Sequence, residues 1–184
     1  MCEMLFSYGF IEEATKSAHE IFLEIEIPND DPLRLAKLHV SRAAPGVTIT
    51  EHVNGIEWQS DFIWLVCVNE EDGLEFRALQ TNDESQELRV FWKHKELVDM
   101  SEFHEKLLMD DIWEVFQLRA VAIIQERVEN QLQDAYHQIE GAENTKPDGS
   151  AFVRKEPFQM ATKLRNCETM LLERFYEELE TKVW

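Results

Sequence analysis

Histidines and cysteines can bind metals or form disulfides when their spacing in the sequence brings them together. In this chain no two of them have such a spacing. None of the six histidines forms an HxxxH or HExxH pair, which would place two imidazoles on one helix face for a metal. The three cysteines, Cys2, Cys67 and Cys167, are widely separated and form no CxxC pair, so they indicate neither a zinc site nor a disulfide framework. We therefore expect no metal site, ordinary surface or core histidines, and a reducing compartment.

The sequence also gives no strong indication of an acid–base pair or of a phosphate-binding loop. Neighbouring carboxylates such as Glu70 with Glu71, or Asp110 with Asp111, could exchange a proton with a substrate if buried, but in so acidic a chain such pairs usually lie in solvent or cap helices. The six glycines form neither GxGxxG nor GxxxxGK, so no nucleotide-binding loop is predicted. No local signature links a cysteine or serine to a histidine and an acid. From the residues alone, we expect no autonomous active site.

Tryptophans are the remaining candidates for a functional surface, because large rigid rings dominate binding hot spots. Trp64 and Trp113 lie in apolar runs and are predicted to pack in the core. Trp58 and Trp92 lie in more polar stretches, so they are the better candidates for a surface that anchors a peptide.

The charge of the chain limits its possible partners. The 184 residues include 18 Lys and Arg against 37 Asp and Glu, which gives a formal net charge of -19. A field of this sign repels nucleic acid and anionic membranes and accommodates a basic protein partner more easily, although acidity also simply keeps a chain soluble. No apolar run approaches the roughly 18 to 20 residues of a membrane span. We expect a soluble intracellular protein, cytoplasmic or nuclear, without nucleic acid or membrane partners.

Short elements are predicted near the N-terminus. Glu3 to Tyr8 read as the last turns of a helix, and Gly9 stands where a left-handed residue would close it. Glu20 to Ile27 alternate between isoleucine or leucine and mostly acidic residues, a period of two that predicts a half-buried strand. The sequence PNDDP from Pro28 to Pro32 is a turn in which either aspartate can cap a short helix that continues to Leu38.

The apolar run from Phe62 to Val68 is ambiguous by periodicity. It could be a buried strand that pairs through the NEEDG turn with Leu74 to Leu79, or it could be a buried helix. We favour the helix by a small margin.

Two helix starts follow, because Asp99 with Glu102 and Asp111 with Glu114 both have the spacing of a capping box ahead of an apolar run. The second start leads into a helix of about seven turns with one apolar stripe. The stripe is predicted to contain Val115, Leu118, Val121, Ala122, Val128, Leu132, Ala135 and Ile139.

A polar loop from Gly141 to Ser150 separates this helix from a final one. The final helix is predicted to bury a stripe made of Phe158, Ala161, Leu164, Met170, Leu171, Phe175 and Leu179. The two long helices can then pack as an antiparallel pair. The predicted fold is mainly α, a helical lobe with two long C-terminal helices and a minor β element near the N-terminus.

Two segments resemble the Rubisco large-subunit methyltransferase family of SET-domain protein-lysine methyltransferases. EMLFSYGFIE, from Glu3 to Glu12, is similar to the segment that closes the SET domain, where a helix ends in a YGF-like motif. KLRNCETMLLERF resembles the final helix of the family, with Arg165 and Glu168 at the matching positions. The resemblance identifies residues 1–12 as the end of the SET domain and residues 13–184 as the substrate-binding domain.

The resemblance implies roles for the first of these segments. In the family, the SET core binds S-adenosylmethionine and a lysine side chain from opposite faces, and the C-terminal lobe holds the protein substrate. By resemblance, Tyr8 lies near the target lysine, while Gly9 and Phe10 lie beside the methyl donor. From the residues alone, these three also fit a helix cap with two buried rings.

The catalytic part of the family pattern is missing from this sequence. Met1, Cys2 and Glu3 stand where the family has Asn-x-Glu, and neither the Asn-His pair nor the catalytic tyrosine that precede it are present. We therefore predict a protein-substrate-binding lobe of a truncated or degenerate methyltransferase, which by itself binds no cofactor and is not active. The alternative is a freestanding acidic helical adaptor that binds a basic protein.

Overall fold

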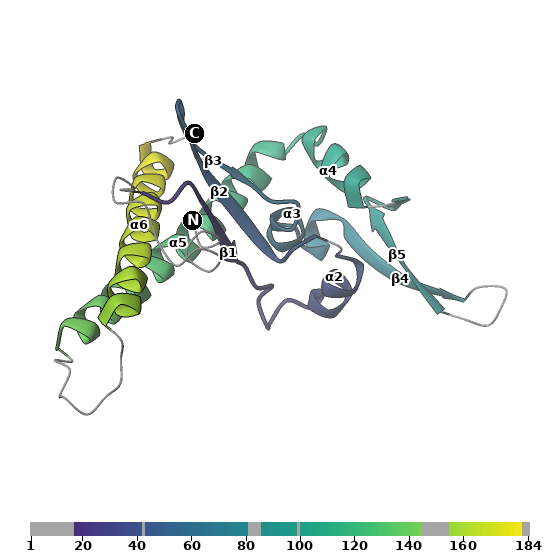
Figure 1. Cartoon of the computed structure of the whole chain (residues 1–184). Helices are drawn as coiled ribbons and strands as arrows, with labels where there is room; N and C mark the ends of the chain where they lie inside the picture. The colour runs from purple at the N-terminus through teal and green to yellow at the C-terminus, as the bar shows by residue number, and fades with distance from the viewer. Residues whose placement is uncertain (1–16, 42, 81–85, 99, 145–154, 182–184) are drawn as a thin grey trace. The chain divides into compact units, whose positions relative to one another are not determined.

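The computed structural model describes residues 17–41, 43–80, 86–98, 100–144 and 155–181 (Figure 1). Contacts within the chain divide it into two compact units. Unit 1 comprises Met1–Leu23, Thr48–Trp58 and Ile124–Trp184, and unit 2 comprises Glu24–Val47 and Gln59–Ile123. Both units are therefore built from segments that are discontinuous in the sequence.

A small sheet lies largely in unit 1. Its strands are β1 (Glu20–Glu24), β2 (Gly46–His52) and β3 (Gly55–Gln59), in the order β1-β2-β3. The alternation that predicted the first strand is confirmed, since Leu23 is buried and Phe22 is half exposed. A two-residue turn joins β2 to β3, and Gly55 follows it with a φ of 143°, a conformation that only glycine adopts without strain.

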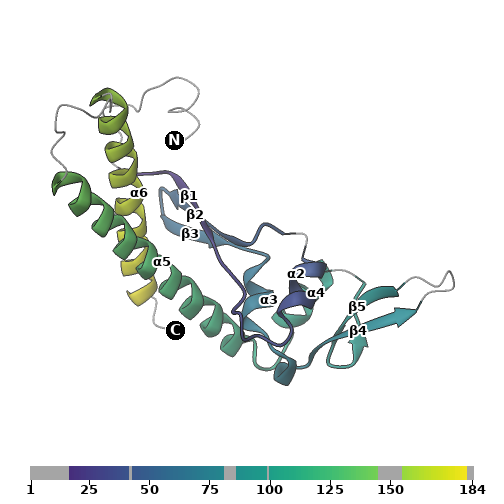
Figure 2. The same cartoon turned by 90° about the horizontal axis from the view of Figure 1, so that it is seen from below.

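Two long helices complete unit 1, and both were predicted. They are α5 (Trp113–Asn144), which enters the unit at Ile124, and α6 (Lys155–Thr181). Figures 1 and 2 show this part of α5 and α6 side by side and antiparallel. The side chains buried on the two helices are Ile124, Val128, Leu132 and Ala135 of α5 and Cys167, Leu171, Leu172, Phe175 and Leu179 of α6.

Unit 2 contains short helices and an antiparallel hairpin. The helical elements are α2 (Arg34–Val40), α3 (Ile63–Cys67), the 3₁₀ turn η1 (Glu70–Asp72), α4 (Met100–Leu108) and the first part of α5. The strands β4 (Leu74–Gln80), β5 (Gln86–Trp92) and β6 (Lys95–Glu96) form a second sheet in that order. Leu74 pairs with Trp92 at one end of the β4–β5 ladder and Gln80 with Gln86 at the other.

Residues 62 to 68 form the buried helix that we favoured over a strand. Every side chain from Phe62 to Val68 is buried, which explains why the run is apolar on both faces. The Ser60 hydroxyl accepts a hydrogen bond from the Ile63 amide at 3.0 Å and donates one to the Gly46 carbonyl at 2.6 Å. The serine ahead of the apolar run thus marks the start of a helix, which the periodicity of the run did not distinguish from a strand.

Aromatic rings form the centre of unit 2. The Trp92 ring meets the rings of Phe103 and Phe116 edge-on, with centroids 5.5 and 5.9 Å apart. Trp64 stacks on His104 at 5.1 Å and contacts Trp113 at 4.8 Å. Packing of Trp64 in the core is confirmed, since it is 6% exposed.

Placing Trp92 on a contact surface was wrong, because this ring is only 5% exposed. Its polar neighbours in the sequence, Lys93 and His94, are exposed in the turn between β5 and β6, whereas the Trp92 ring itself is packed in the core. Both have positive φ values, 48° and 68°, as the mirror-image hairpin turn requires. Trp58, the other candidate, is half-buried in β3.

The fold is mixed rather than mainly α. Both long C-terminal helices are present, but the strands of residues 46–59 and 74–96 make the β part larger than the predicted minor element. The predicted stripe of the long helix was also wrong in its first turns, where Val115, Leu118 and Ala122 are exposed. Of the predicted positions there, Val121 is buried, and Phe116, Ala120 and Ile124 are buried beside it. The helix also runs through the first residues of the predicted Gly141–Ser150 loop, to Asn144.

Among the helices that the structure describes, none is both long enough and apolar enough to cross a membrane.

Candidate functional site

The residues to which the family resemblance gives roles, Tyr8, Gly9 and Phe10, lie outside the described residues, and so does the predicted helix end at Glu3 to Tyr8. Their roles remain predictions. Two polar sites lie among the described residues, a buried polar cluster in unit 2 and an open cavity in unit 1.

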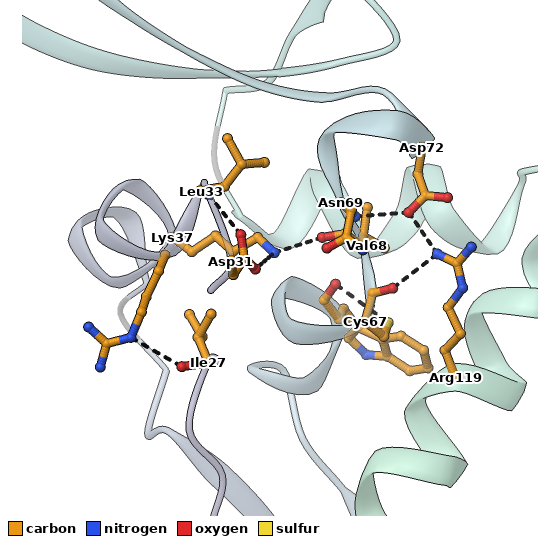
Figure 3. Close-up of polar contacts among 11 residues, drawn as sticks. Ile27, Asp31, Leu33, Lys37, Cys67, Val68, Asn69, Asp72 and Arg119 are labelled. Carbon is orange, nitrogen blue, oxygen red and sulfur yellow. Dashed lines mark hydrogen bonds and ion pairs between the residues drawn. The ribbon is translucent and has the colours of Figure 1, made fainter. Parts of the chain in front are cut away.

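The polar cluster surrounds the C-terminal end of α3 and is drawn in Figure 3. Lys37 of α2 is fully buried, and its ammonium lies 2.5 Å from Asp31 Oδ2 and 2.8 Å from the Val68 carbonyl oxygen. Asp31 is also nearly buried, and its Oδ1 accepts a hydrogen bond from the Leu33 amide at 2.7 Å. Of the two aspartates predicted to cap, Asp31 makes the contact: it lies three residues before the helix begins at Arg34 and binds the amide of Leu33, the residue directly before the helix.

A second cation binds the same end of α3. The Arg119 guanidinium, from α5, donates hydrogen bonds to the Cys67 carbonyl at 3.3 Å and to Asp72 Oδ2 at 2.7 Å. Asp72 Oδ2 also accepts a hydrogen bond from the Asn69 amide at 2.8 Å, which closes the capping box of η1. The last carbonyls of a helix carry partial negative charge and have no partner within the helix, so two cations satisfy them here.

The polar cluster is arranged for stability rather than for reaction. Each of its cations, Lys37 and Arg119, has one carboxylate and one carbonyl as partners. Sequence reasoning missed Lys37, because a lysine inside a short helix normally faces solvent. No local signal in the sequence marks this lysine: in the structure Leu35 and Leu38 are exposed, and Lys37 between them is buried.

The two described thiols are protonated at neutral pH. Burial raises the pKa of the Cys67 thiol to about 12, and the nearby Arg119 guanidinium offsets only part of this effect. Burial also raises the pKa of the Cys167 thiol. Because the thiolate is the nucleophile, neither cysteine is activated.

Paired carboxylates behave as the sequence led us to expect. Glu70 and Glu71 are exposed on η1. Asp110 is paired with Lys93 at 2.5 Å, and its Oδ1 accepts a hydrogen bond from the Ile112 amide at 3.3 Å. The cap-like contact before α5 thus comes from Asp110, whereas Asp111 was the residue predicted to make it.

An open cavity of about 190 Å³ lies in unit 1 among residues of β1, α5 and α6. Its lining consists of Ile21, Gln131, Ala135, Gln138, Arg165, Glu168, Thr169 and Leu172. Arg165 and Glu168 are the two positions on which the resemblance of the final helix to the family rests, and both line this cavity. An arginine, a carboxylate and two amides can together hold a polar side chain.

No cluster of three or more histidine, cysteine or acidic side chains that could hold a metal ion occurs within the described ranges. No protein-family model, no curated protein and no solved structure matches the chain. The family assignment therefore depends on the sequence motifs alone.

Proposed function

We propose that this chain is the protein-substrate-binding lobe of a SET-type, S-adenosylmethionine-dependent protein-lysine methyltransferase. The observation that carries the proposal is the segment EMLFSYGFIE, from Glu3 to Glu12, which resembles the end of the SET domain. In this proposal, Tyr8 lies beside the target lysine, and Gly9 and Phe10 lie beside the methyl donor. A phenol can hydrogen-bond to an amine, and an aromatic ring can stack on an adenine, so the residue types suit these places.

The charge of the chain supports a protein substrate that is rich in lysine. A net charge of -19 attracts a basic segment and accelerates its association, most strongly at low salt. The catalytic core would supply the methyl donor and the transfer step, while this chain would bind and orient the substrate. The mixed fold alters the architecture expected for such a lobe but leaves its proposed task unchanged.

The transcript upstream of Met1 provides the first test. We expect the reading frame to continue upstream through the Asn-His pair and the other SET motifs, because the family pattern places them directly before Glu3. An open reading frame upstream of Met1 that lacks the Asn-His pair and the other SET motifs would refute the proposal that this chain is part of a longer methyltransferase.

The protein translated from that longer frame provides the second test. It should bind S-adenosylmethionine in calorimetry and methylate lysine peptides, and Phe10→Ala should weaken binding of the donor. Phe22→Ala is the matched control, because Phe22 is a half-exposed ring outside the motif. Equal loss in both variants would show that the effect of Phe10→Ala is not specific to the donor.

The second candidate function is a freestanding acidic adaptor for a basic protein, and the net charge of -19 favours it as well. The two functions differ in their dependence on the methyl donor. An adaptor binds its partner with this chain alone and shows no change when S-adenosylmethionine is added, whereas the extended methyltransferase binds both.

A further inference from the structure

The first half of α5 carries an apolar stripe on its exposed side. Ile112, directly before the helix, is 42% exposed, and Val115 and Leu118 are 42% and 58% exposed. Ala122 continues the stripe one turn further, and it too is exposed. We call these four residues the α5 stripe.

The geometry of a helix separates the α5 stripe from the core of unit 2. At ~100° per residue, the three members within the helix, Val115, Leu118 and Ala122, fall within an arc of about 60°. The buried residues Phe116, Ala120, Val121 and Ile124 lie on an arc centred roughly 160° away. The α5 stripe is therefore a second apolar face, which the described part of the chain leaves uncovered.

The residues just before the α5 stripe are also apolar and exposed. Leu108 at the end of α4 and Met109 after it are 51% and 84% exposed. Single exposed apolar side chains are common on protein surfaces, but a run at helical spacing is typical of a surface that another element covers.

Acidic side chains accompany the stripe. Glu105, Asp111 and Glu114 are exposed on the same stretch of chain. The cations nearby already have partners within the chain, since Lys106 pairs with Glu102 at 3.5 Å and Arg119 with Asp72 at 2.7 Å. The stripe therefore lies within a locally acidic surface.

Charge decides which occupant suits this surface. A second copy of the chain would bring another net charge of -19 against it, and an anionic lipid surface would also be repelled. We propose that the α5 stripe docks a basic amphipathic helix of a partner protein, whose apolar face covers Val115 and Leu118 while its lysines or arginines meet the surrounding acids. The inference deepens the proposed function, on which it rests, by naming the partner class and the surface.

The test uses the full chain and a fluorescein-labelled helical peptide of about 18 residues, with leucines on one face and lysines on the other. In fluorescence anisotropy we expect a micromolar Kd for the wild-type protein. The double variant Val115→Gln/Leu118→Gln should weaken binding by about tenfold or more, because two apolar contacts are lost. Leu35→Gln is the matched control, since Leu35 is a 79% exposed leucine on α2 of the same unit, and it should leave the Kd unchanged.

A second pair of variants tests the role of charge. Asp111→Lys/Glu114→Lys should weaken binding of the same peptide and reduce the dependence of the Kd on salt. A peptide in which glutamines replace the leucines keeps the charge and should bind much more weakly. Circular dichroism and the urea midpoint verify that each variant is folded.

Three outcomes would overturn the inference. One is a glutamine double variant that is folded and binds like the wild type, and another is a glutamine peptide that binds as tightly as the leucine peptide. The third is a wild-type dimer in sedimentation that Val115→Gln/Leu118→Gln dissociates, because the occupant would then be a second copy. The upstream reading frame fails or succeeds independently of these results, so loss of the methyltransferase assignment and loss of the docking surface are distinguishable.

Discussion

Replacing Lys37 with methionine tests the role of the buried polar cluster in stability. Methionine keeps the length of the apolar stem but removes the ammonium, which leaves the nearly buried Asp31 carboxylate and the Val68 carbonyl without this donor. Removing one partner of a buried ion pair costs about 3–5 kcal/mol, because the remaining charge is left uncompensated. Against a total stability of about 5–15 kcal/mol, this loss is large.

Urea unfolding followed by tryptophan fluorescence suits the measurement. Trp64, Trp92 and Trp113 all belong to unit 2, which also contains Lys37. With a slope of about 2 kcal/mol per molar urea, a loss of 3 kcal/mol lowers the midpoint by about 1.5 M. Lys106→Met is the matched control, because this lysine is 44% exposed and pairs with Glu102 across one helical turn, so its loss should cost under about 0.5 kcal/mol.

A double-mutant cycle separates the ion pair from the packing of the lysine stem. Asp31→Asn keeps an oxygen for the Leu33 amide but removes the charge, so it should recover about 2 kcal/mol of the loss caused by Lys37→Met. A Lys37→Met protein within 1 kcal/mol of the wild type, or a cycle with no coupling energy, would contradict the reasoning.

Three further changes test other contacts. The Arg174 guanidinium donates a hydrogen bond to Glu51 and lowers the pKa of that carboxyl below its usual 4.5. The pair therefore stabilises the fold above pH 4.5. This stabilisation is lost as the pH falls through the pKa that Glu51 has in the folded protein. In urea titrations, Glu51→Gln should therefore cost under about 1 kcal/mol at pH 7, and the difference from the wild type should shrink on acidification, whereas a growing difference would contradict the assignment. His94→Gly should raise the free energy of unfolding by about 1 kcal/mol, because glycine adopts a φ of 68° without strain, while His94→Ala, which retains the strain, should not. Burial raises the pKa of the Cys67 thiol to about 12, so its alkylation at pH 8 should require unfolding of the protein. Mass spectrometry can map the alkylated cysteine. Rapid labelling of Cys67 in the native protein would contradict this prediction.

Strong periodic patterns predicted the elements that they cover. The strand around Leu23, the helix after PNDDP and the two long helices all occur, and their signals are local alternation, caps and stripes. The first turns of α5 show the limit of this approach, because that stretch contains two apolar faces. Nothing local indicates that Phe116 is covered by the Trp92 ring while Val115 is not.

The β4–β5–β6 sheet could not be recognised from turn chemistry. Its tight turn uses Lys93 and His94, although such turns favour asparagine and glycine. Both side chains contact carboxylates, Lys93 that of Asp110 and His94 that of Glu75 at 2.7 Å, and these contacts depend on the finished fold. The residues with proposed roles are the opposite case: Tyr8, Gly9 and Phe10 come from a motif in the sequence and lie outside the residues that the structure describes.

The contacts of α6 with the sheet of unit 1 imply an order of events during synthesis. The Ile56 amide donates a hydrogen bond to Glu178, 122 positions later, and Glu51 pairs with Arg174 across 123 positions. The last residue of unit 2, in contrast, is Ile123. At about 5–20 residues per second, several seconds pass between the end of unit 2 and the arrival of Glu178 at the ribosome's active site. During that interval β2 and β3 have no α6 to pack against. In a nascent chain whose unit 2 is already folded, the side chain of Ile56 would therefore still be accessible to chaperones.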